Sequence, residues 1–370
     1  MQLRYRKQAT AAGVAAVALT LTLGACSSSS SSSAAAGGSS SSGSASSSGG
    51  SANLSGTLNG SGSTLQLVYQ QAAISAFKSV QSGMTVNYGG GGSGKGRTDL
   101  AGGTVQFAGS DSPIPAKEAS NFKGKTVLYY PILIAPITVS YNLSGLSKPL
   151  QLSGPVIANI FSGKTTKWND PAIAADNPGV TLPSTSITVA VRSDSSGTTQ
   201  NFSQFLMEAG GSAWTLGSSS IIKWPSTAHA GNGNSGVAQI IKSTPGAIGY
   251  VDYATAKASS LTYASVKNKD GSYVAPSVQS ATTAADNATV KPDLTFSAIW
   301  APGASSYPIT AQSWVLVYQT QSEANTAKML QAYIGYLVGA GQQLLPQLGY
   351  APLPSGIDQK AKTQLSKIGM

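Results

Sequence analysis

The sequence predicts an α/β protein with two lobes. Short segments rich in β-branched and aromatic residues alternate with segments whose apolar residues recur every three or four positions. This alternation is typical of strands followed by amphipathic helices. About 320 residues follow a low-complexity segment near the start of the chain, which is more than one hydrophobic core usually holds. We therefore expect the folded part of the chain to divide in two.

The first residues have the pattern of an export signal. Three basic residues are followed by residues 9–25, which are uncharged and mostly Ala, Val and Leu. This apolar run is short for a membrane span, so it favours a signal peptide. It ends in Leu-Gly-Ala-Cys, which resembles a bacterial lipobox and predicts that residues 1–25 are removed and Cys26 is lipidated. An uncleaved anchor helix and cleavage without lipidation are the alternatives.

The segment that follows has the composition of a tether. Cys26 is the only cysteine, which excludes a disulfide within the chain and a cysteine-based metal site. Residues 27–51 are all Ser, Ala or Gly, and 16 of these 25 residues are Ser. Such a segment cannot bury apolar surface, so we predict a disordered tether over 26–52. Lipid on Cys26 would hold the protein at the outer face of a membrane.

The chain is basic, but its charged residues are few and spread along the sequence. The formal net charge is +10, and removing the three basic residues of the signal leaves +7 (10 − 3), with only three Glu in the whole chain. An excess of this kind can attract an anion or an anionic lipid surface. The basic residues form no Lys/Arg block and do not alternate with aromatic residues, so nucleic acid is not an expected partner.

The first predicted elements are one helix and two strands. The helix comes after the Gly/Ser-rich segment 58–63, keeps apolar residues at helical spacing up to Val80, and ends at Gly83. Segments 85–89 and 104–111 combine β-branched and aromatic residues between glycines, which predicts strands.

The most apolar run of the mature chain is residues 127–142. It contains Pro131 and Pro136. Because proline has no N–H for a ladder hydrogen bond, we expect two extended segments here instead of one strand. We also expect them to cross between the two lobes.

The second half continues the alternation. A strand at 187–194 is followed by helical spacing that runs to Leu206 and stops at Gly210 and Gly211. The remaining predicted elements are a helix at 235–246, a strand at 247–253, an extended segment at 307–318 and a helix at 322–341.

Four loops share one design, in which small residues follow a strand and precede a helix start or a tight turn. A helix N-terminus with exposed N–H groups binds oxyanions, and glycine lets the backbone approach a ligand closely. An ordinary helix cap is the simpler interpretation of any single loop. Four such loops in a chain with few carboxylates favour an anion site. They are residues 60–65, 89–96, 108–114 and 192–199.

Arg192 is the candidate cation of this site. It and Arg97 are the only arginines after the signal. The guanidinium fork can bind two oxygens of a tetrahedral anion at once, which Lys cannot do. The alternative is a surface ion pair with Asp194, and we expect Asp194 to orient Arg192 in either case.

Asp111 is unusual in an anion site because a carboxylate repels a fully ionised anion. It can, however, accept a hydrogen bond from a protonated one. Phosphate near neutral pH still carries a proton and sulfate does not, so a buried carboxylate discriminates between them. The alternative interpretation of Asp111 is a turn cap before Pro113.

Several stretches together resemble a known family. In this order and at this spacing they are similar to those of the substrate-binding lipoproteins of phosphate-specific ABC transporters, which have a type II periplasmic-binding-protein fold. The resemblance covers about residues 56–354. The stretches are GSGST (60–64), VNYGGGGSGKG (86–96), VQFAGSDSPI (105–114), SGKTTKWNDPAI (162–173), VRSDSSGTTQNF (191–202), GNGNSGVAQIIKSTPGAIGYVDYA (231–254), YPITAQSWVLV (307–317) and LGYAPLP (348–354).

The resemblance implies a phosphate-binding site between the lobes. Asp111 would accept the phosphate proton, Arg192 would pair with the phosphate oxygens, and Asp194 would support Arg192. This chain departs from the usual pattern at Leu65, where the family has an aromatic residue. The other implied contacts are Thr64, the Leu65 backbone, Ser93, Ser196, the Gly197 N–H and Thr198.

The resemblance also implies the lobe boundaries and the partner. Lobe I would combine residues 53–131 with 305–370, and lobe II would be residues 132–304, with two hinge crossings between them. A monomer would capture phosphate outside the cytoplasm, at the cell membrane, and deliver it to the permease of an ABC importer. No cofactor is implied.

Three other functions are compatible with parts of the sequence. A secreted phosphatase or serine hydrolase would use Ser196 with the only histidine, His229, and no cluster of His, Asp and Glu suits a metal. A binding protein for sulfate, molybdate or tungstate would keep the fold, but Asp111 argues against these fully ionised anions. An adhesive or signalling surface protein would keep the fold without the ligand.

Overall fold

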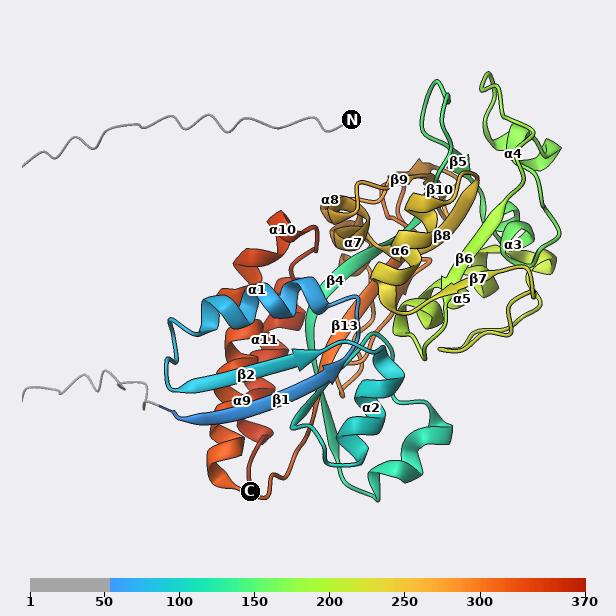
Figure 1. The fold of residues 1–370 in the computed structure, drawn as a ribbon. Helices are drawn as coiled ribbons and strands as arrows, with labels where there is room; N and C mark the ends of the chain where they lie inside the picture. Colours follow the sequence, from blue (N-terminus) through green and yellow to red (C-terminus); the bar gives the residue numbers. More distant parts are fainter. Residues whose placement is uncertain (1–53) are drawn as a thin grey trace, which may run out of the picture. The chain divides into compact units, whose positions relative to one another are not determined.

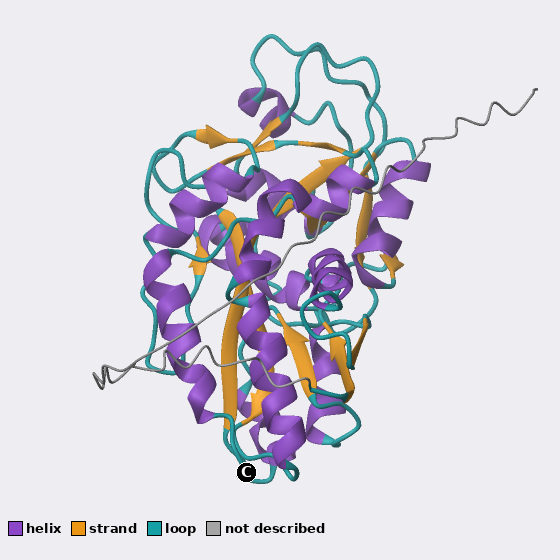
Figure 2. Cartoon of the chain, turned by 90° about the vertical axis from the view of Figure 1, so that its left-hand side faces the viewer, coloured by secondary structure: helices purple, strands orange, loops and turns teal. Residues whose placement is uncertain are grey.

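The computed structural model describes residues 54–370, which form an α/β body whose strands run through the middle with helices on both sides (Figures 1 and 2). The predicted signal peptide, the lipidation site at Cys26 and the tether at 26–52 lie outside these residues. Among the described residues, no helix has the length and apolarity needed to cross a bilayer.

One half of the main sheet, which we call the β1 half, is built on a parallel core. β1 pairs in parallel with β2 and β3, and β13 runs antiparallel to both β3 and β4. The strand order is β2-β1-β3-β13-β4. The strands are β1 (Gly56–Gly62), β2 (Met84–Gly89), β3 (Phe107–Ser110), β4 (Val127–Tyr141) and β13 (Ile309–Tyr318).

The other half, the β6 half, continues from the far end of β4. β8 pairs antiparallel with β4, and β6 is parallel to both β8 and β7. Its strands are β6 (Thr188–Arg192), β7 (His229–Gly231) and β8 (Ala247–Asp252). The remaining strands are short: β5 (Gln151–Leu152), β9 (Thr262–Tyr263), β10 (Ser265–Lys267), β11 (Tyr273–Val274) and β12 (Ala298–Ile299).

β4 is a single strand, so the expectation of two separate segments is wrong. Its pairing with β13 shifts register beside Pro131, where Ile132 has no partner. An extra residue of this kind is a β-bulge, which accommodates a residue that has no N–H to donate. Residues 127–136 pair with β13 and residues 137–141 pair with β8. β4 therefore joins the two halves of the sheet.

The helices predicted from periodicity are present, and others lie between them. α1 (Leu67–Phe77), α5 (Gly197–Ala209), α6 (Gly233–Ser243) and α9 (Ala324–Leu337) correspond to the four predicted helices. The others are α2 (Ser93–Ala101), α3 (Gly154–Phe161), α4 (Pro171–Asp176), α7 (Tyr253–Ala258), α8 (Val278–Asp286), α10 (Leu345–Leu348) and α11 (Ser355–Gln364), with 3-10 turns at Ala116–Phe122, Gly211–Ala213, Ala340–Leu344 and Leu365–Lys367.

Aromatic packing fixes α5 against the sheet. Phe202 of α5 stacks on Tyr250 of β8 with ring centroids 4.3 Å apart, and Phe161 of α3 contacts both rings. All three side chains are buried. Rings this close add to the stabilisation that comes from burial alone. The first turn of α5 is thus held rigidly at the end of β6.

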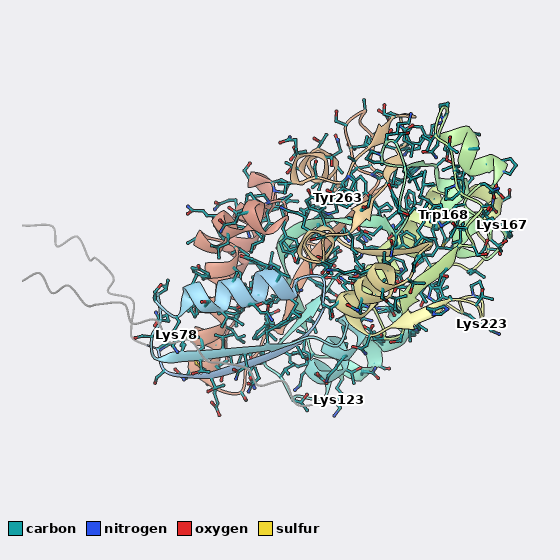
Figure 3. The ribbon with its side chains drawn as sticks, turned by 45° about the horizontal axis from the view of Figure 1, so that its top comes forward. Lys78, Lys123, Lys167, Trp168, Lys223 and Tyr263 are labelled. Atoms are coloured by element: carbon teal, nitrogen blue, oxygen red, sulfur yellow. The ribbon has the colours of Figure 1, made fainter. Side chains whose placement is uncertain are left out.

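The basic residues are spread around the body. Lys78, Lys123 and Lys223 are exposed and come from different elements, as the side-chain view shows (Figure 3). This matches the thin spread of charge expected from the sequence.

Candidate functional site

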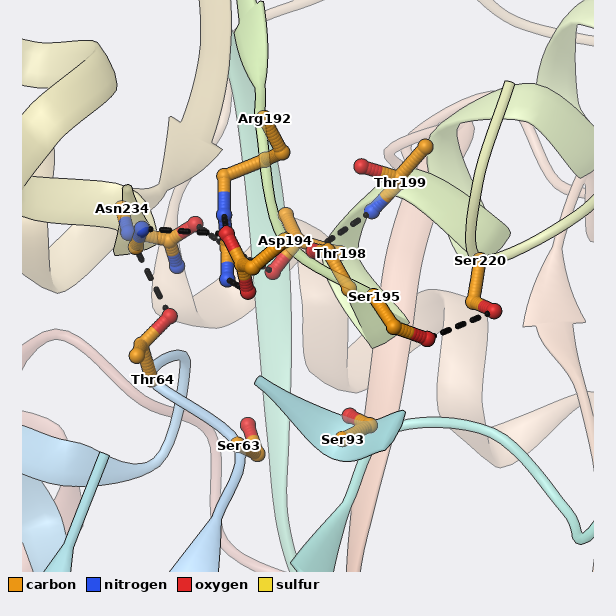
Figure 4. A network of polar contacts seen from close by, with 12 residues as sticks. Ser63, Thr64, Ser93, Arg192, Asp194, Ser195, Thr198, Thr199, Ser220 and Asn234 are labelled. Carbon is orange, nitrogen blue, oxygen red and sulfur yellow. Dashed lines mark hydrogen bonds and ion pairs between the residues drawn. The ribbon is translucent and has the colours of Figure 1, made fainter. Parts of the chain in front are cut away.

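The four small-residue loops predicted as an anion site meet between the β1 half and the β6 half: Figure 4 shows residues of three of them, and Asp111 of the fourth accepts hydrogen bonds from Ser63 and Ser93. β1 and β3 are parallel neighbours paired at Gly62 and Gly109, so the loops after them leave the same edge of the sheet. The first turn of α2 faces the loop after β6, where Gly94 N–H donates to Ser195 O at 2.9 Å.

Asp111 lies at the centre of this region and is 1% exposed. Its Oδ1 accepts hydrogen bonds from Ser63 Oγ (2.6 Å) and Ser313 Oγ (2.5 Å), while Oδ2 accepts, among the side chains of residues 54–370, a single long one from Ser93 Oγ (3.3 Å). Burial raises the pKa of Asp111, and the hydrogen bonds from Ser313 and Ser63 and the charge of Arg192 oppose this shift without cancelling it. Oδ2 keeps room for a further donor.

Arg192, at the end of β6, is almost fully buried and is held on two sides. Its Nε donates to Asp194 Oδ1 at 2.7 Å and its Nη2 pairs with Asp194 Oδ2. Its Nη1 donates to Asn234 Oδ1 at 2.5 Å and to Thr198 Oγ1 at 3.4 Å. A guanidinium has five N–H groups, so one on Nη2 has no partner among residues 54–370 and is available to a ligand, and the long contact to Thr198 can be exchanged.

Asp194 is the fixed counter-charge of Arg192, as the sequence predicted. It also accepts a hydrogen bond from Gly233 N–H at 3.1 Å. Burial would raise the pKa of Asp194, but the hydrogen bond and charge of Arg192 outweigh it, and the net pKa is lowered. Asp194 is therefore ionised at neutral pH and holds the guanidinium in one orientation.

The first turn of α5 supplies backbone donors. Ser196 is the N-cap residue, and its Oγ accepts a hydrogen bond from Thr199 N–H at 3.1 Å. The first N–H groups of a helix have no partner within the helix and carry the positive end of its dipole. Gly197 and Thr198, both buried, are the first residues of α5. This end of α5 suits an anion.

Gly197 also lies directly against Asp111. A Cβ added to Gly197 would overlap Ser93 Oγ and would lie 2.8 Å from Asp111 Oδ2. Oδ2 is thus the carboxylate oxygen that faces α5, and the two halves of the sheet are in close contact here.

The loop after β1 contributes the Thr64 hydroxyl and is held in place by hydrogen bonds of its backbone. Thr64 Oγ1 accepts a hydrogen bond from Asn234 N–H at 3.3 Å, so the Thr64 hydroxyl faces the β6 half. Leu65 is fully buried, and its N–H donates to Ser63 Oγ at 3.1 Å. Tyr350 Oη donates to Leu65 O at 2.7 Å, which fixes the loop from below.

Four residues of this network were not predicted from the sequence: Ser63, Asn201, Asn234 and Ser313. Asn201 Nδ2 donates to Asp111 O at 2.6 Å, and Asn234 Nδ2 donates to Asp252 Oδ1 at 2.6 Å. All four stand inside stretches that the sequence already marked, so their neighbours were a usable signal. The signal was weakest for Ser313, which lies within strand β13 and not in one of the four small-residue loops.

A cavity of about 790 Å³ adjoins the site on the side of Asp111 and Asn201. Lys269, Lys291 and Trp300 are among the residues that line it. It reaches from the loop after β3 to the segment that leads into β13, so it gives solvent a route toward the buried polar network.

The residues of the alternative hydrolase interpretation lie in different environments. His229 is exposed on the edge strand β7, whereas Ser196 is buried as the N-cap of α5. No hydrogen bond within residues 54–370 joins the two side chains. The described residues also contain no group of three or more His, Cys, Asp or Glu placed to hold a metal ion.

Comparisons with known proteins identify the family. A family model of the PBP superfamily domain matches residues 43–340. The phosphate-binding protein PstS of Pasteurella multocida (strain Pm70) is 35% identical over 313 residues, which cover 83% of this chain and 89% of that protein. Phosphate-binding protein PstS 3 of Mycobacterium leprae is 34% identical over 324 residues, covering 84% of this chain and 87% of the relative.

Solved structures show the same fold. A high-affinity periplasmic phosphate-binding protein (PfluDING) bound with phosphate superposes with a TM-score of 0.68 at 21% identity, covering 84% of this chain and 94% of the other. A phosphate-binding protein from Stenotrophomonas maltophilia gives a TM-score of 0.67 at 20% identity, covering 83% and 93%. The fold predicted from the sequence, a two-lobed α/β periplasmic-binding-protein fold, is confirmed. The chain belongs to the PBP superfamily and, within it, to the family of the PstS phosphate-binding proteins.

Proposed function

We propose that this protein captures inorganic phosphate outside the cytoplasm and delivers it to an ABC-type importer. One observation carries the proposal: a buried carboxylate, Asp111, faces the first turn of α5 beside a guanidinium, Arg192, whose orientation is fixed. Few ligands need a hydrogen-bond acceptor, a cation and backbone donors within one small cage. A protonated tetrahedral oxyanion needs all three.

Each group of the cage has a role toward phosphate. Asp111 Oδ2 accepts the phosphate proton, and Arg192 binds phosphate oxygens through its free Nη2 N–H and the exchangeable Nη1 N–H. The remaining donors are the hydroxyls of Thr64, Ser93, Ser196 and Thr198 and the Gly197 N–H, whereas the Leu65 N–H expected from the sequence is directed at Ser63 Oγ at 3.1 Å.

Asp111 gives the site its preference for phosphate over sulfate. An ionised carboxylate inside the cage has no donor to meet in sulfate and lies against a like charge. Leaving a buried charged acceptor unpaired costs about 3 kcal/mol or more, which corresponds to discrimination of roughly 100-fold or greater. The same reasoning disfavours molybdate and tungstate.

The lobes would close over the ligand as rigid bodies. We keep the predicted boundaries of 53–131 with 305–370 for lobe I and 132–304 for lobe II, and β4 and the segment before β13 would act as hinges. Among residues 54–370, the hydrogen bonds that join the β1 half to the β6 half at the site include Gly94 N–H to Ser195 O, Asn234 N–H to Thr64 Oγ1, Asn201 Nδ2 to Asp111 O, and Gln312 Nε2 to Asn201 Oδ1. They support a closed state that the permease would recognise.

We further propose that the protein acts as a monomer held at the cell membrane by lipid on Cys26. Support comes from the sequence pattern around Cys26 and from the Ser/Gly/Ala composition of 26–52. Metabolic labelling with a radioactive fatty acid, lost in Cys26→Ala, tests the anchor.

We propose that the protein binds phosphate without catalysing a reaction. Ser196 Oγ accepts the Thr199 N–H as a helix cap, and within residues 54–370 no hydrogen bond joins it to the exposed His229. Turnover of a chromogenic phosphate ester that disappears in Ser196→Ala would favour a phosphatase instead.

Isothermal titration calorimetry with inorganic phosphate on the purified full chain tests the proposed function. We expect one phosphate per chain with a dissociation constant in the micromolar range or below. Absence of a binding heat together with an unchanged melting temperature at millimolar phosphate would contradict it, because a ligand that binds only the folded state raises the melting temperature.

A further inference from the structure

The two oxygens of Asp111 differ sharply in how they are hydrogen-bonded. Oδ1 accepts short hydrogen bonds from two hydroxyls, Ser63 Oγ at 2.6 Å and Ser313 Oγ at 2.5 Å. A carboxylate oxygen has two lone pairs, so these donors fill Oδ1. Oδ2 has only the 3.3 Å contact from Ser93 Oγ. The ligand must therefore meet Asp111 at Oδ2.

The donors around Ser63 and Ser313 orient both hydroxyls so that each donates a hydrogen bond to Asp111 Oδ1. Ser63 Oγ accepts the Leu65 N–H at 3.1 Å, and Ser313 Oγ accepts Gln66 Nε2 at 2.8 Å. A hydroxyl has one hydrogen, and with a donor already directed at its oxygen that hydrogen points to the remaining acceptor, Oδ1. A proton bound to Oδ1 would collide with two donors, so Oδ1 cannot be protonated without breaking this arrangement.

We propose that Ser63 and Ser313 determine the anion specificity of the site by fixing Asp111 as an ionised acceptor that presents Oδ2 to the ligand. This inference rests on the proposed phosphate-binding function and extends it to two residues from opposite ends of the chain. Ser63 follows β1, and Ser313 lies within β13, the strand that leads back from the second predicted hinge. Both are positioning residues because they act through Asp111.

The reason is that the protonation state of Asp111 decides which anion fits. An ionised Oδ2 accepts the proton of phosphate and repels sulfate. A protonated Asp111 would donate to sulfate and lose its preference. Because burial pushes the pKa of Asp111 upward, the two hydroxyl hydrogen bonds are needed to limit that rise.

The other ionisable groups around Asp111 act in both directions. Arg192 of β6 favours the ionised form, whereas the carboxyl of Asp252 at the end of β8 disfavours it. The phenols of Tyr88 of β2 and Tyr350 after α10 also lie within electrostatic range. Arg97 of α2 donates to the flanking residues Ser110 and Ser112 and is paired with Glu118. None of these groups donates a hydrogen bond to Oδ1, so they do not replace the serines.

The test compares anion selectivity among variants. Phosphate and sulfate affinities are measured by calorimetry between pH 5.5 and 8 for the full chain and for Ser313→Ala and Ser63→Ala. Ser203→Ala is the control, because it also removes a buried hydroxyl that donates to backbone oxygens, Gln200 O and Ser219 O, away from Asp111. Using variant-to-wild-type ratios cancels the titration of phosphate itself.

We expect Ser313→Ala and Ser63→Ala to lower the ratio of phosphate to sulfate affinity by roughly 10-fold or more at pH 7. The loss grows toward pH 5.5, since a higher pKa brings protonation of Asp111 to a higher pH. Ser203→Ala keeps the wild-type ratio. In an Asp111→Asn background, Ser313→Ala has no further effect on the ratio, because no carboxylate is left to hold.

Two results overturn the inference. One is a wild-type selectivity ratio at every pH in both serine variants. The other is a change in selectivity caused by Ser313→Ala in the Asp111→Asn background that is as large as the change it causes in the wild-type background. Ser313→Cys replaces the hydroxyl with a thiol, a weaker donor at the same branch of the side chain, so it gives the same comparison if the alanine variant does not fold. If the wild-type chain binds no phosphate, the proposed function itself fails. If the wild-type chain prefers phosphate over sulfate and both serine variants keep the same preference, only this inference fails.

Discussion

Gly197→Ala is the substitution that separates lobe closure from folding. Gly197 is the first residue of α5, and its φ lies outside the left-handed region, so the helix accepts Ala there. The added Cβ would overlap Ser93 Oγ, and it would lie 2.7 Å from Asp111 Cβ and 2.8 Å from Asp111 Oδ2. All of these atoms belong to the β1 half, so the clash arises only when the two halves meet.

The size of the effect follows from these distances. Ordinary contacts of a Cβ begin at 3.4 Å, so the two halves must stay apart by about 1 Å more. A phosphate held by the first turn of α5 would then lose its hydrogen bonds to Asp111 Oδ2 and Ser93 Oγ. Hydrogen bonds to charged groups contribute about 1.5–3 kcal/mol each, so we expect a loss of about 3–6 kcal/mol. That is a roughly 10²- to 10⁴-fold weaker affinity.

Calorimetry with phosphate measures the affinity, and thermal melting without phosphate measures folding. Gly356→Ala in α11 is the matched control, because nothing lies within 4 Å of its added Cβ. Both variants should melt at or slightly above the wild-type temperature, since Ala stabilises a helix by up to about 1 kcal/mol relative to Gly. Phosphate affinity within about 3-fold of wild type in Gly197→Ala would refute the reasoning.

Three further predictions concern the residues behind the cage. Burial raises the pKa of Asp252 to about 6, so the folded state holds a proton that the unfolded state has released. The stability of the wild-type chain relative to Asp252→Asn should therefore fall by about 2 kcal/mol as the pH rises from 4 to 6, which melting curves of the two chains measure; a stability difference that does not change with pH would contradict the raised pKa. Asn234→Ala removes the acceptor for Arg192 Nη1 and should weaken phosphate binding by roughly 10-fold in calorimetry, whereas an unaltered affinity would show that Asp194 alone orients the guanidinium. Asn201→Ala removes the hydrogen bond to Asp111 O across the site and should speed phosphate release by roughly 10-fold in stopped-flow fluorescence, with little change in the association rate; equal release rates would argue against a closing contact.

The sequence sufficed for the polar loops because local chemistry marks them. Arg192, Asp194 and Ser196 stand together in one short stretch, and the structure places the arginine, its counter-charge and the helix cap as expected. Their convergence with Asp111 depends on contacts between the two halves of the sheet, such as Asn201 Nδ2 to Asp111 O, which the alternation of strands and helices does not specify.

Other features depend on tertiary context that no local pattern reports. Ser313 is a buried hydroxyl residue within β13, and only the pairing of β13 with β3 and β4 brings it to Asp111. Pro131 predicted a break in the chain, yet a β-bulge absorbs its missing N–H and keeps β4 continuous. The sequence did not predict α2, because the glycine-rich residues at its start have a low helix propensity. In the structure α2 packs against β1 and β3, and this packing outweighs the low propensity.

The proposed selectivity for phosphate depends on Asp111 accepting a hydrogen bond from a proton on the ligand. The most direct measurement is the calorimetric affinity for phosphate and for sulfate, at neutral pH, of the full chain and of Asp111→Asn. We expect the wild type to prefer phosphate by roughly 100-fold or more, and we expect Asp111→Asn to narrow the gap by binding phosphate less tightly and sulfate more tightly. Equal affinity of the wild type for both anions, unchanged in Asp111→Asn, would contradict the account.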